Sequence, residues 1–149
     1  MNKFFKTILL TIIIIFLGFS SGCTNKDLSA RSRISDLSEI DIPSNSEIVF
    51  NHKEDVFFPV PGRRTQYTVF EFEELPIEFL HDENFQDEKD VDFEELFDWE
   101  FISFSHTFDI PNEYHPNWDI EYLWLDTSSG IYFVYFIESN LLIVYIVGN

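Results

Sequence analysis

The sequence predicts a small α+β domain with an antiparallel sheet of about five or six strands, and two patterns support this prediction. The first is a row of three apolar segments near the C-terminus, at residues 120–125, 131–138 and 141–147. The second is a pair of strand-like segments that predicts a hairpin with a long loop. Residues 47–53 have three consecutive apolar residues at their centre, and residues 66–73 alternate. A segment with helical spacing lies between the two patterns, so a short helix is expected beside the sheet.

The three C-terminal segments predict a meander. Ser139 and Asn140 separate the last two and favour a two-residue turn in which Asn140 takes a positive φ. All three segments are apolar at successive positions and not only at alternate ones. Because successive side chains of a strand point to opposite faces, we expect both faces of this sheet to be covered.

The hairpin is predicted from residues on both sides of a proline-containing stretch. Residues 57–64 include two prolines, which would interrupt a strand ladder, and are therefore expected to form a loop. Residues 66–73 then alternate, which assigns their side chains to two faces. The alternation places Phe70 and Phe72 on one face, and Tyr67 and Val69 on the other.

The helix is predicted inside an acidic stretch. Asp92 and Glu95 have the spacing of a helix N-cap and its reciprocal partner, and the apolar residues that follow have helical spacing. These signals predict a short helix over residues 93–99. Residues 101–108 alternate between larger and smaller side chains, which predicts a further strand.

The N-terminal 22 residues have the layout of a secretory signal peptide. Lys3 and Lys6 supply positive charge, residues 7–19 are apolar, and small residues follow. The apolar run is shorter than the roughly 20 residues that a helix needs to span a bilayer. A retained membrane span is therefore the weaker alternative.

The small residues Ser20, Ser21 and Gly22 run directly into Cys23, which is the one cysteine of the sequence. This arrangement resembles the lipobox of bacterial lipoproteins. The resemblance implies cleavage between Gly22 and Cys23 and attachment of a diacylglyceryl group, with acyl chains such as palmitate, to the Cys23 thiol. Two acyl chains give stable membrane anchoring. The alternative is an exported cysteine without lipid, which has no second cysteine for an internal disulfide.

The domain organisation follows from these features. Residues 1–22 are expected to be the signal peptide, residues 23–41 a lipidated cysteine with a polar tether, and residues 42–149 a single globular domain. Ile34, Leu37 and Ile40 have the spacing of one helical face, so a short helix that docks on the domain is the alternative to a tether.

The net charge of −18 excludes nucleic acid as the first expected partner, because phosphate groups would be repelled. Eight acids lie between Asp82 and Glu95, with Lys89 as the basic residue among them. A cationic protein would be attracted to such a surface, and the alternative is a solvated acidic face. The candidate partner-binding residues are Asp87, Glu88 and Asp90, together with Arg63 and Arg64 at the tip of the expected loop.

We expect no catalytic residue, cofactor or metal site. The four histidines do not have the spacing of a zinc site, and the acidic stretch has no glycine at the sixth position of a calcium loop. A tyrosine and the tryptophans could stack on sugar rings, although alternating aromatic residues usually belong to a core. These residues are Trp99, Trp118, Tyr122 and Trp124.

The sequence therefore predicts an exported protein that is lipid-anchored in the cell membrane or outer membrane. Its expected role in the cell envelope is binding or structural and is not enzymatic. The first alternative is an acidic immunity or inhibitor lipoprotein that neutralises a basic toxin or enzyme. The second is an enzyme that acts on polysaccharide.

Overall fold

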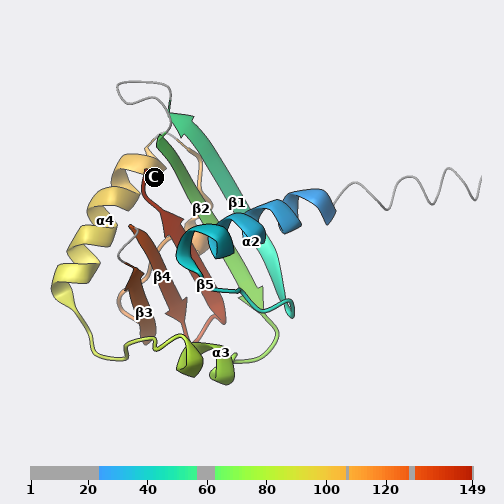
Figure 1. Ribbon diagram of the computed structural model, residues 1–149. Helices are drawn as coiled ribbons and strands as arrows, with labels where there is room; N and C mark the ends of the chain where they lie inside the picture. Colours follow the sequence, from blue (N-terminus) through green and yellow to red (C-terminus); the bar gives the residue numbers. More distant parts are fainter. Residues whose placement is uncertain (1–23, 57–62, 107, 128–129, 149) are drawn as a thin grey trace, which may run out of the picture.

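Within the described residues, five antiparallel strands form one sheet in the order β1-β2-β5-β4-β3 (Figure 1). The computed structural model describes residues 24–56, 63–106, 108–127 and 130–148, with the backbone alone described at residues 24–29, 54–56, 63, 64 and 103. The strands are β1 (Ser46–Val56), β2 (Arg63–Phe72), β3 (Tyr122–Thr127), β4 (Ile131–Phe136) and β5 (Leu141–Ile146).

The predicted α+β class is confirmed. β3, β4 and β5 form the expected antiparallel meander, and β1 and β2 form the expected antiparallel pair. The pair joins the meander because β2 also lies beside β5, with Gln66 opposite Ile146 and Glu71 opposite Leu141. The last strand of the chain is therefore the central strand of the sheet.

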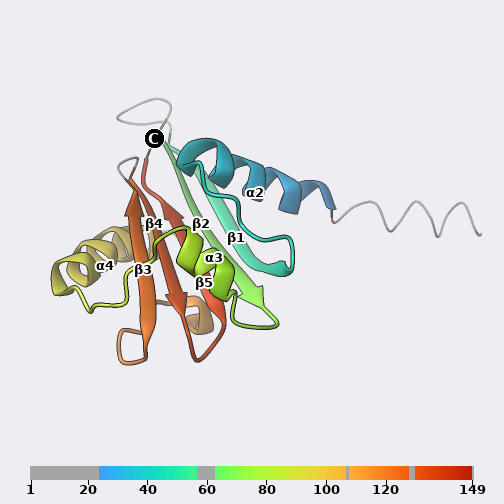
Figure 2. The same ribbon diagram turned by 60° about the horizontal axis from the view of Figure 1, so that its bottom comes forward.

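Helices lie on both faces of the sheet, as Figures 1 and 2 show from two directions. α4 (Val91–Ser105) covers one face, while α2 (Thr24–Ser38) and the short α3 (Ile77–Asp82) cover the other. A 3₁₀ turn, η1 (Asn112–Tyr114), lies in the connection from α4 to β3.

The side chains of the sheet divide between two apolar cores. All six residues of β4 are buried, and they alternate between the two cores. Phe70 and Phe72 contribute to the core beneath α2 and α3, whereas Tyr67 and Val69 contribute to the core beneath α4, as predicted. Each fully buried side chain of this size stabilises the fold by about 1.5–3 kcal/mol. The expectation that both faces of the sheet are covered is confirmed.

α4 is longer than the predicted helix, and the predicted strand at residues 101–108 is wrong. α4 continues through residue 105, because its apolar side chains keep helical spacing beyond the expected end. The apolar residues of that stretch fit both the alternation of a strand and the three-to-four-residue spacing of a helix. Packing of the helical face against the sheet favours the helix. The buried face of α4 consists of Phe93, Phe97, Phe101 and Phe104.

The N-cap of α4 is Asp90, so the predicted cap at Asp92 is wrong. The backbone N–H of Phe93 donates to Asp90 Oδ1 over 3.0 Å. Asp92 lies inside the first turn, where its exposed negative charge is favourable beside the positive end of the helix.

Residues 24–38, predicted as part of a polar tether, form helix α2, in agreement with the helical alternative. Ala30 and Ile34 are buried, and Ile34 belongs to the core shared with β2, β4 and β5. The Arg31 guanidinium donates to the carbonyl of Pro43 over 2.8 Å and lies 4.9 Å from the centre of the Phe70 ring. The helix is therefore held against the sheet by apolar and polar contacts.

The turn between β4 and β5 has four residues and not the predicted two. Phe136 is paired with Leu141, so residues 137–140 make the connection. The positive φ expected for Asn140 is confirmed, with a value of 53°. The Tyr135 hydroxyl donates to Asn140 Oδ1 over 2.8 Å, which fixes the asparagine side chain at this position.

Candidate interaction surface

The segment between α3 and α4 is held against β3 by backbone contacts. Gln86 and Trp124 exchange two backbone hydrogen bonds of 2.8 and 3.0 Å. The Trp124 indole N–H donates to the carbonyl of Glu88 over 2.9 Å. The Lys89 ammonium donates to the carbonyl of Trp118 over 2.7 Å. These contacts use backbone atoms of the segment and the Lys89 side chain, and they leave the Asp87 and Glu88 side chains exposed to solvent.

Asp87 and Glu88, which are predicted partner-binding residues, are both exposed on this segment. Asp90 is half-buried and accepts the capping hydrogen bond from Phe93. The structure therefore brings the three predicted acids together in one stretch but gives Asp90 a structural contact.

Two acids of α4 are also engaged with the domain. The Tyr122 hydroxyl donates to Glu94 Oε1 over 2.6 Å, and the Trp118 indole N–H donates to Asp98 Oδ1 over 2.8 Å. Burial and the hydrogen bond to Glu94 raise the pKa of Tyr122 to about 12. These contacts hold α4 against β3 and the connection that precedes it.

The outward side of α4 carries two further acids and several apolar side chains. Asp92 and Glu95 are exposed, and so are Val91, Leu96, Trp99 and Ile102. The sequence prediction missed these apolar residues as a surface because it ended the helix at residue 99. The available signal was the spacing of Val91, Trp99 and Ile102, which are eight and three positions apart and therefore fall on one side of a helix.

Most of the aromatic residues that were considered for stacking on sugar rings pack in or against the apolar core beneath α4. All three tryptophans lie in the described part of the chain, and of these Trp99 is the exposed one. Trp124 is buried, with its ring stacked on Phe93 at a centroid distance of 4.4 Å. Trp118 packs edge-on against Phe97 and Tyr122. The structure gives no open row of aromatic rings among these residues.

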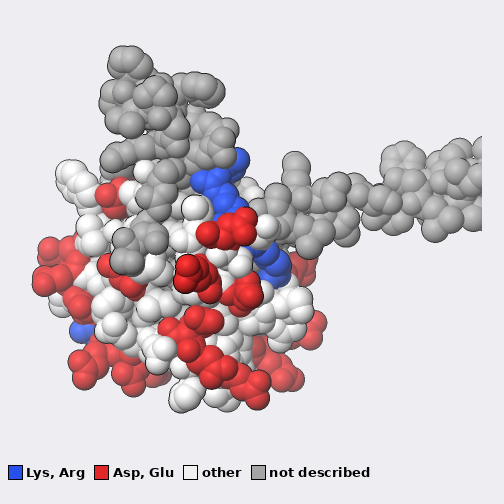
Figure 3. All heavy atoms as spheres, in the orientation of Figure 1, with Lys and Arg blue, Asp and Glu red and all other residues white. Residues whose placement is uncertain are grey.

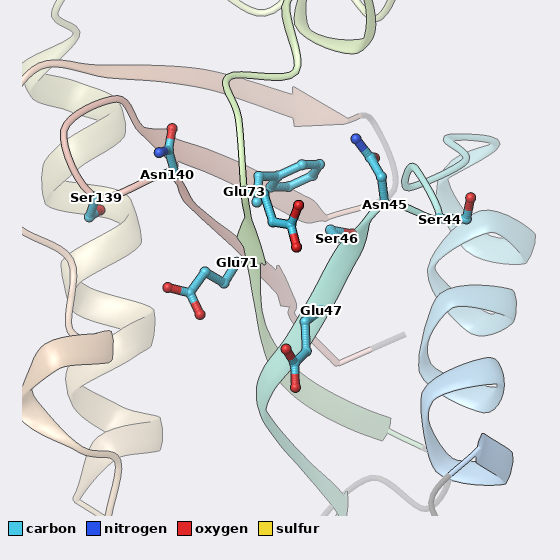
Figure 4. Close-up of a pocket in the computed structure, with 9 residues that line it drawn as sticks. Ser44, Asn45, Ser46, Glu47, Glu71, Glu73, Ser139 and Asn140 are labelled. Carbon is cyan, nitrogen blue, oxygen red and sulfur yellow. The ribbon is translucent and has the colours of Figure 1, made fainter.

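A polar hollow of about 590 Å³ lies where β1 and β2 meet the turn between β4 and β5 (Figure 4). Glu47 and Glu71 lie directly opposite each other across the two strands, and like charges in such a pair repel. Glu73 lines the same hollow. Among the side chains that the structure describes, no group of three or more His, Cys, Asp or Glu residues is placed to hold a metal ion.

The remaining predicted site residues lie largely outside the described part. Arg63 and Arg64, expected in a loop, begin β2 opposite Val56 and Asp55, but their side chains are not described. Gly22 and Cys23 lie outside the described residues. Among the helices that are described, none is long and apolar enough to cross a membrane.

Comparison of the chain with protein-family models, with curated proteins and with solved structures found no match. The fold and the exposed residues define a small α+β domain. Exposed acids lie on helix α4 and on the segment before it.

Proposed function

We propose that this protein is a lipid-anchored protein of the cell envelope that acts by binding a partner. The observation that carries the proposal is the sole cysteine, Cys23, at the end of a segment with the layout of a signal peptide. Transfer of a diacylglyceryl group to the Cys23 thiol and cleavage before Cys23 would place two acyl chains at the N-terminus of the mature chain. Two chains are sufficient for stable anchoring.

The position of α2 gives this anchor a short connection to the domain. α2 begins at Thr24, and Ala30 is its first residue known to be buried. A helical rise of 1.5 Å per residue puts Ala30 about 9 Å from Thr24 along the axis. An extended tether over residues 24–40 would span up to ~60 Å. The proposed anchor therefore holds the domain close to the bilayer.

The exposed acids support a binding role directed at a cationic protein. Asp87 and Glu88 lie on the segment before α4, and Asp92 and Glu95 lie on α4 itself. An acidic surface accelerates association with a basic partner and opposes contact with nucleic acid or anionic lipid. An immunity or inhibitor lipoprotein, which covers a basic toxin or enzyme, is the second candidate, and the same acids favour it.

Metabolic labelling with a palmitate analogue tests the anchor. The native chain should take up the label and sediment with membranes, whereas Cys23→Ser should lose both properties. Ser21→Ala is the matched control, because it alters the same stretch without removing the thiol, and it should keep the label. Equal labelling of the native chain and Cys23→Ser would show that the anchor lies elsewhere.

A further inference from the structure

α4 carries apolar side chains on two opposite faces. One face is buried against the sheet. The other presents exposed side chains, with 62% of Val91, 72% of Trp99 and 52% of Ile102 accessible to solvent. At about 100° per residue, these three side chains fall within roughly 80° of one another around the helix axis. We call them, together with Leu96 at their margin, the outer stripe.

An outer stripe of this kind is unusual for a helix on a surface, where charged and polar residues normally lie opposite the core. Large apolar side chains that gather on one exposed side of a helix, with polar residues among and beside them, are typical of an interaction site. Tryptophan in particular is enriched among the residues that dominate binding energy. The outer stripe therefore has the composition of a contact surface.

The charges beside the outer stripe indicate the chemistry of its partner. Glu95 lies one turn after Val91 and one turn before Trp99, so at about 100° per residue it falls within the outer stripe, whereas Asp92 lies at its border. Asp87 and Glu88 are exposed just before the helix begins, and α4 itself contains no lysine or arginine. Figure 3 shows Asp and Glu side chains on the side of the molecule where α4 lies. A complementary surface would present an apolar strip flanked by lysine and arginine.

A second copy of the chain does not meet this requirement. In a symmetric dimer the same patch faces itself, so Asp92 and Glu95 would be brought toward the same acids of the other copy. Repulsion between like charges opposes that contact.

A lipid surface is also disfavoured as the occupant. Anionic headgroups would repel the acids beside the stripe. α4 lies on the opposite face of the sheet from α2, which directly follows the proposed lipidation site (Figures 1 and 2). The outer stripe would then lie on the side of the domain away from the anchor.

We propose that the outer stripe of α4 docks a cationic protein segment that presents an apolar strip bordered by lysine and arginine. This inference rests on the proposed binding function and assigns it a surface and a class of partner. The apolar strip supplies the contact area, while the acids of α4 select basic partners and raise the rate of association.

Titration of a synthetic helical peptide against the full-length protein in detergent tests the inference. The probe has leucines along one face and lysines on both borders, and a second peptide replaces the lysines by glutamates. The native protein should bind the lysine peptide, and its affinity should fall as salt is raised. The glutamate peptide should not bind.

Variants of the protein locate the contact. Trp99→Ser combined with Ile102→Ser should weaken binding of the lysine peptide by about tenfold or more, because truncation of a central contact costs at least 1.4 kcal/mol. Leu75→Ser combined with Ile77→Ser is the matched control. Leu75 is 41% exposed and Ile77 is 67% exposed, and both lie by α3 on the other side of the sheet. This control should bind within about twofold of the native protein.

The charge contribution is tested in the same way. Asp92→Asn combined with Glu95→Gln should weaken binding and reduce its dependence on salt, whereas Glu47→Gln combined with Glu73→Gln should not. Circular dichroism melts confirm that each variant is folded. Equal affinities for the α4 variants and their controls would overturn the inference. So would self-association through the stripe, or binding of the native protein to phosphatidylglycerol vesicles that is lost in Trp99→Ser.

The peptide-binding test of the outer stripe and the labelling test of the lipid anchor can succeed or fail independently. Palmitate labelling that is lost in Cys23→Ser, together with unchanged peptide affinity in the α4 variants, would retain the anchor and reject this surface. Absence of labelling, together with the expected loss of affinity, would reject the anchor and retain the surface.

Discussion

Single polar residues around α4 hold the helix in place, and their contacts decide which acids can meet a partner. Asp90 accepts from the backbone of Phe93, and Glu94 accepts from Tyr122. Asp92 and Glu95 are exposed instead. A run of acids that looks uniform in the sequence is thus divided into structural and solvent-facing residues. Substitutions of the two groups should have different consequences.

Asp90→Ala should lower the free energy of unfolding by about 1 kcal/mol, because the first turn of α4 loses its capping carboxylate. Asp92→Ala is the matched control and should change stability by no more than about 0.5 kcal/mol, the scale of an exposed charge near a helix end. Urea unfolding measured by circular dichroism compares the two. A larger loss for Asp92→Ala would show that Asp92 is the cap.

The Tyr122 hydroxyl should make stability depend on pH in alkaline solution. Its pKa is raised from 10.0 to about 12 in the folded protein, mainly by burial and then by the hydrogen bond to Glu94. A group whose pKa is higher in the folded state contributes stability that is fully present below the unfolded pKa. That contribution is lost as the pH rises from 10 toward 12.

Urea unfolding over this alkaline range, with and without Tyr122→Phe, measures the effect. The native protein should lose stability as the pH rises, and Tyr122→Phe should lose less. Tyr135, whose pKa burial also raises to about 12, accounts for part of the remaining slope. An identical slope for the two proteins would contradict the assignment of Tyr122.

At the scale of secondary structure, the elements with one dominant periodicity could be predicted from the sequence. The two faces of β2 followed from the alternation of its side chains. The meander followed from short apolar runs that are separated by turn residues, such as Ser139 and Asn140. The end of α4 could not be predicted, because Ile102, Phe104 and Phe108 fit an alternating pattern, whereas Phe97, Phe101 and Phe104 fit a helical one. The contact of Phe101 and Phe104 with the sheet decides between them, and such contacts are not visible in a local window.

α2 was ambiguous for a related reason. Its mean composition is polar, and Ile34 is the apolar residue that enters the core directly. Arg31 adds hydrogen bonds to the chain that leads into β1, which spacing alone does not reveal. The outer stripe of α4 was missed because it depends on where the helix ends.

Ile34→Ala should destabilise the full-length protein by about 2–4 kcal/mol, because Ile34 is fully buried and its truncation leaves a cavity. Leu37→Ala, on the same helix but only partly buried, is the control and should cost less. Thermal or urea unfolding gives both values. A negligible effect of Ile34→Ala would mean that residues 24–38 behave as the tether that the composition favours.

At the scale of the whole molecule, the sheet separates two sides with different proposed roles. α2, which follows Cys23, lies with α3 on one face, and α4 lies on the other (Figure 2). The proposed anchor and the proposed contact surface are therefore on opposite sides of the same domain. A domain held near the bilayer through α2 could present α4 to a protein partner. This arrangement depends on lipid attachment at Cys23.

Intact-mass spectrometry of the protein purified from its native envelope tests that claim most directly. The account predicts a chain that begins at Cys23 and whose mass exceeds that of residues 23–149 by a diacylglyceryl group, with any further acyl chain on the α-amino group. Fragmentation should assign the added mass to Cys23. A chain with the unmodified mass of residues 23–149, or one that retains residues 1–22, would contradict the account.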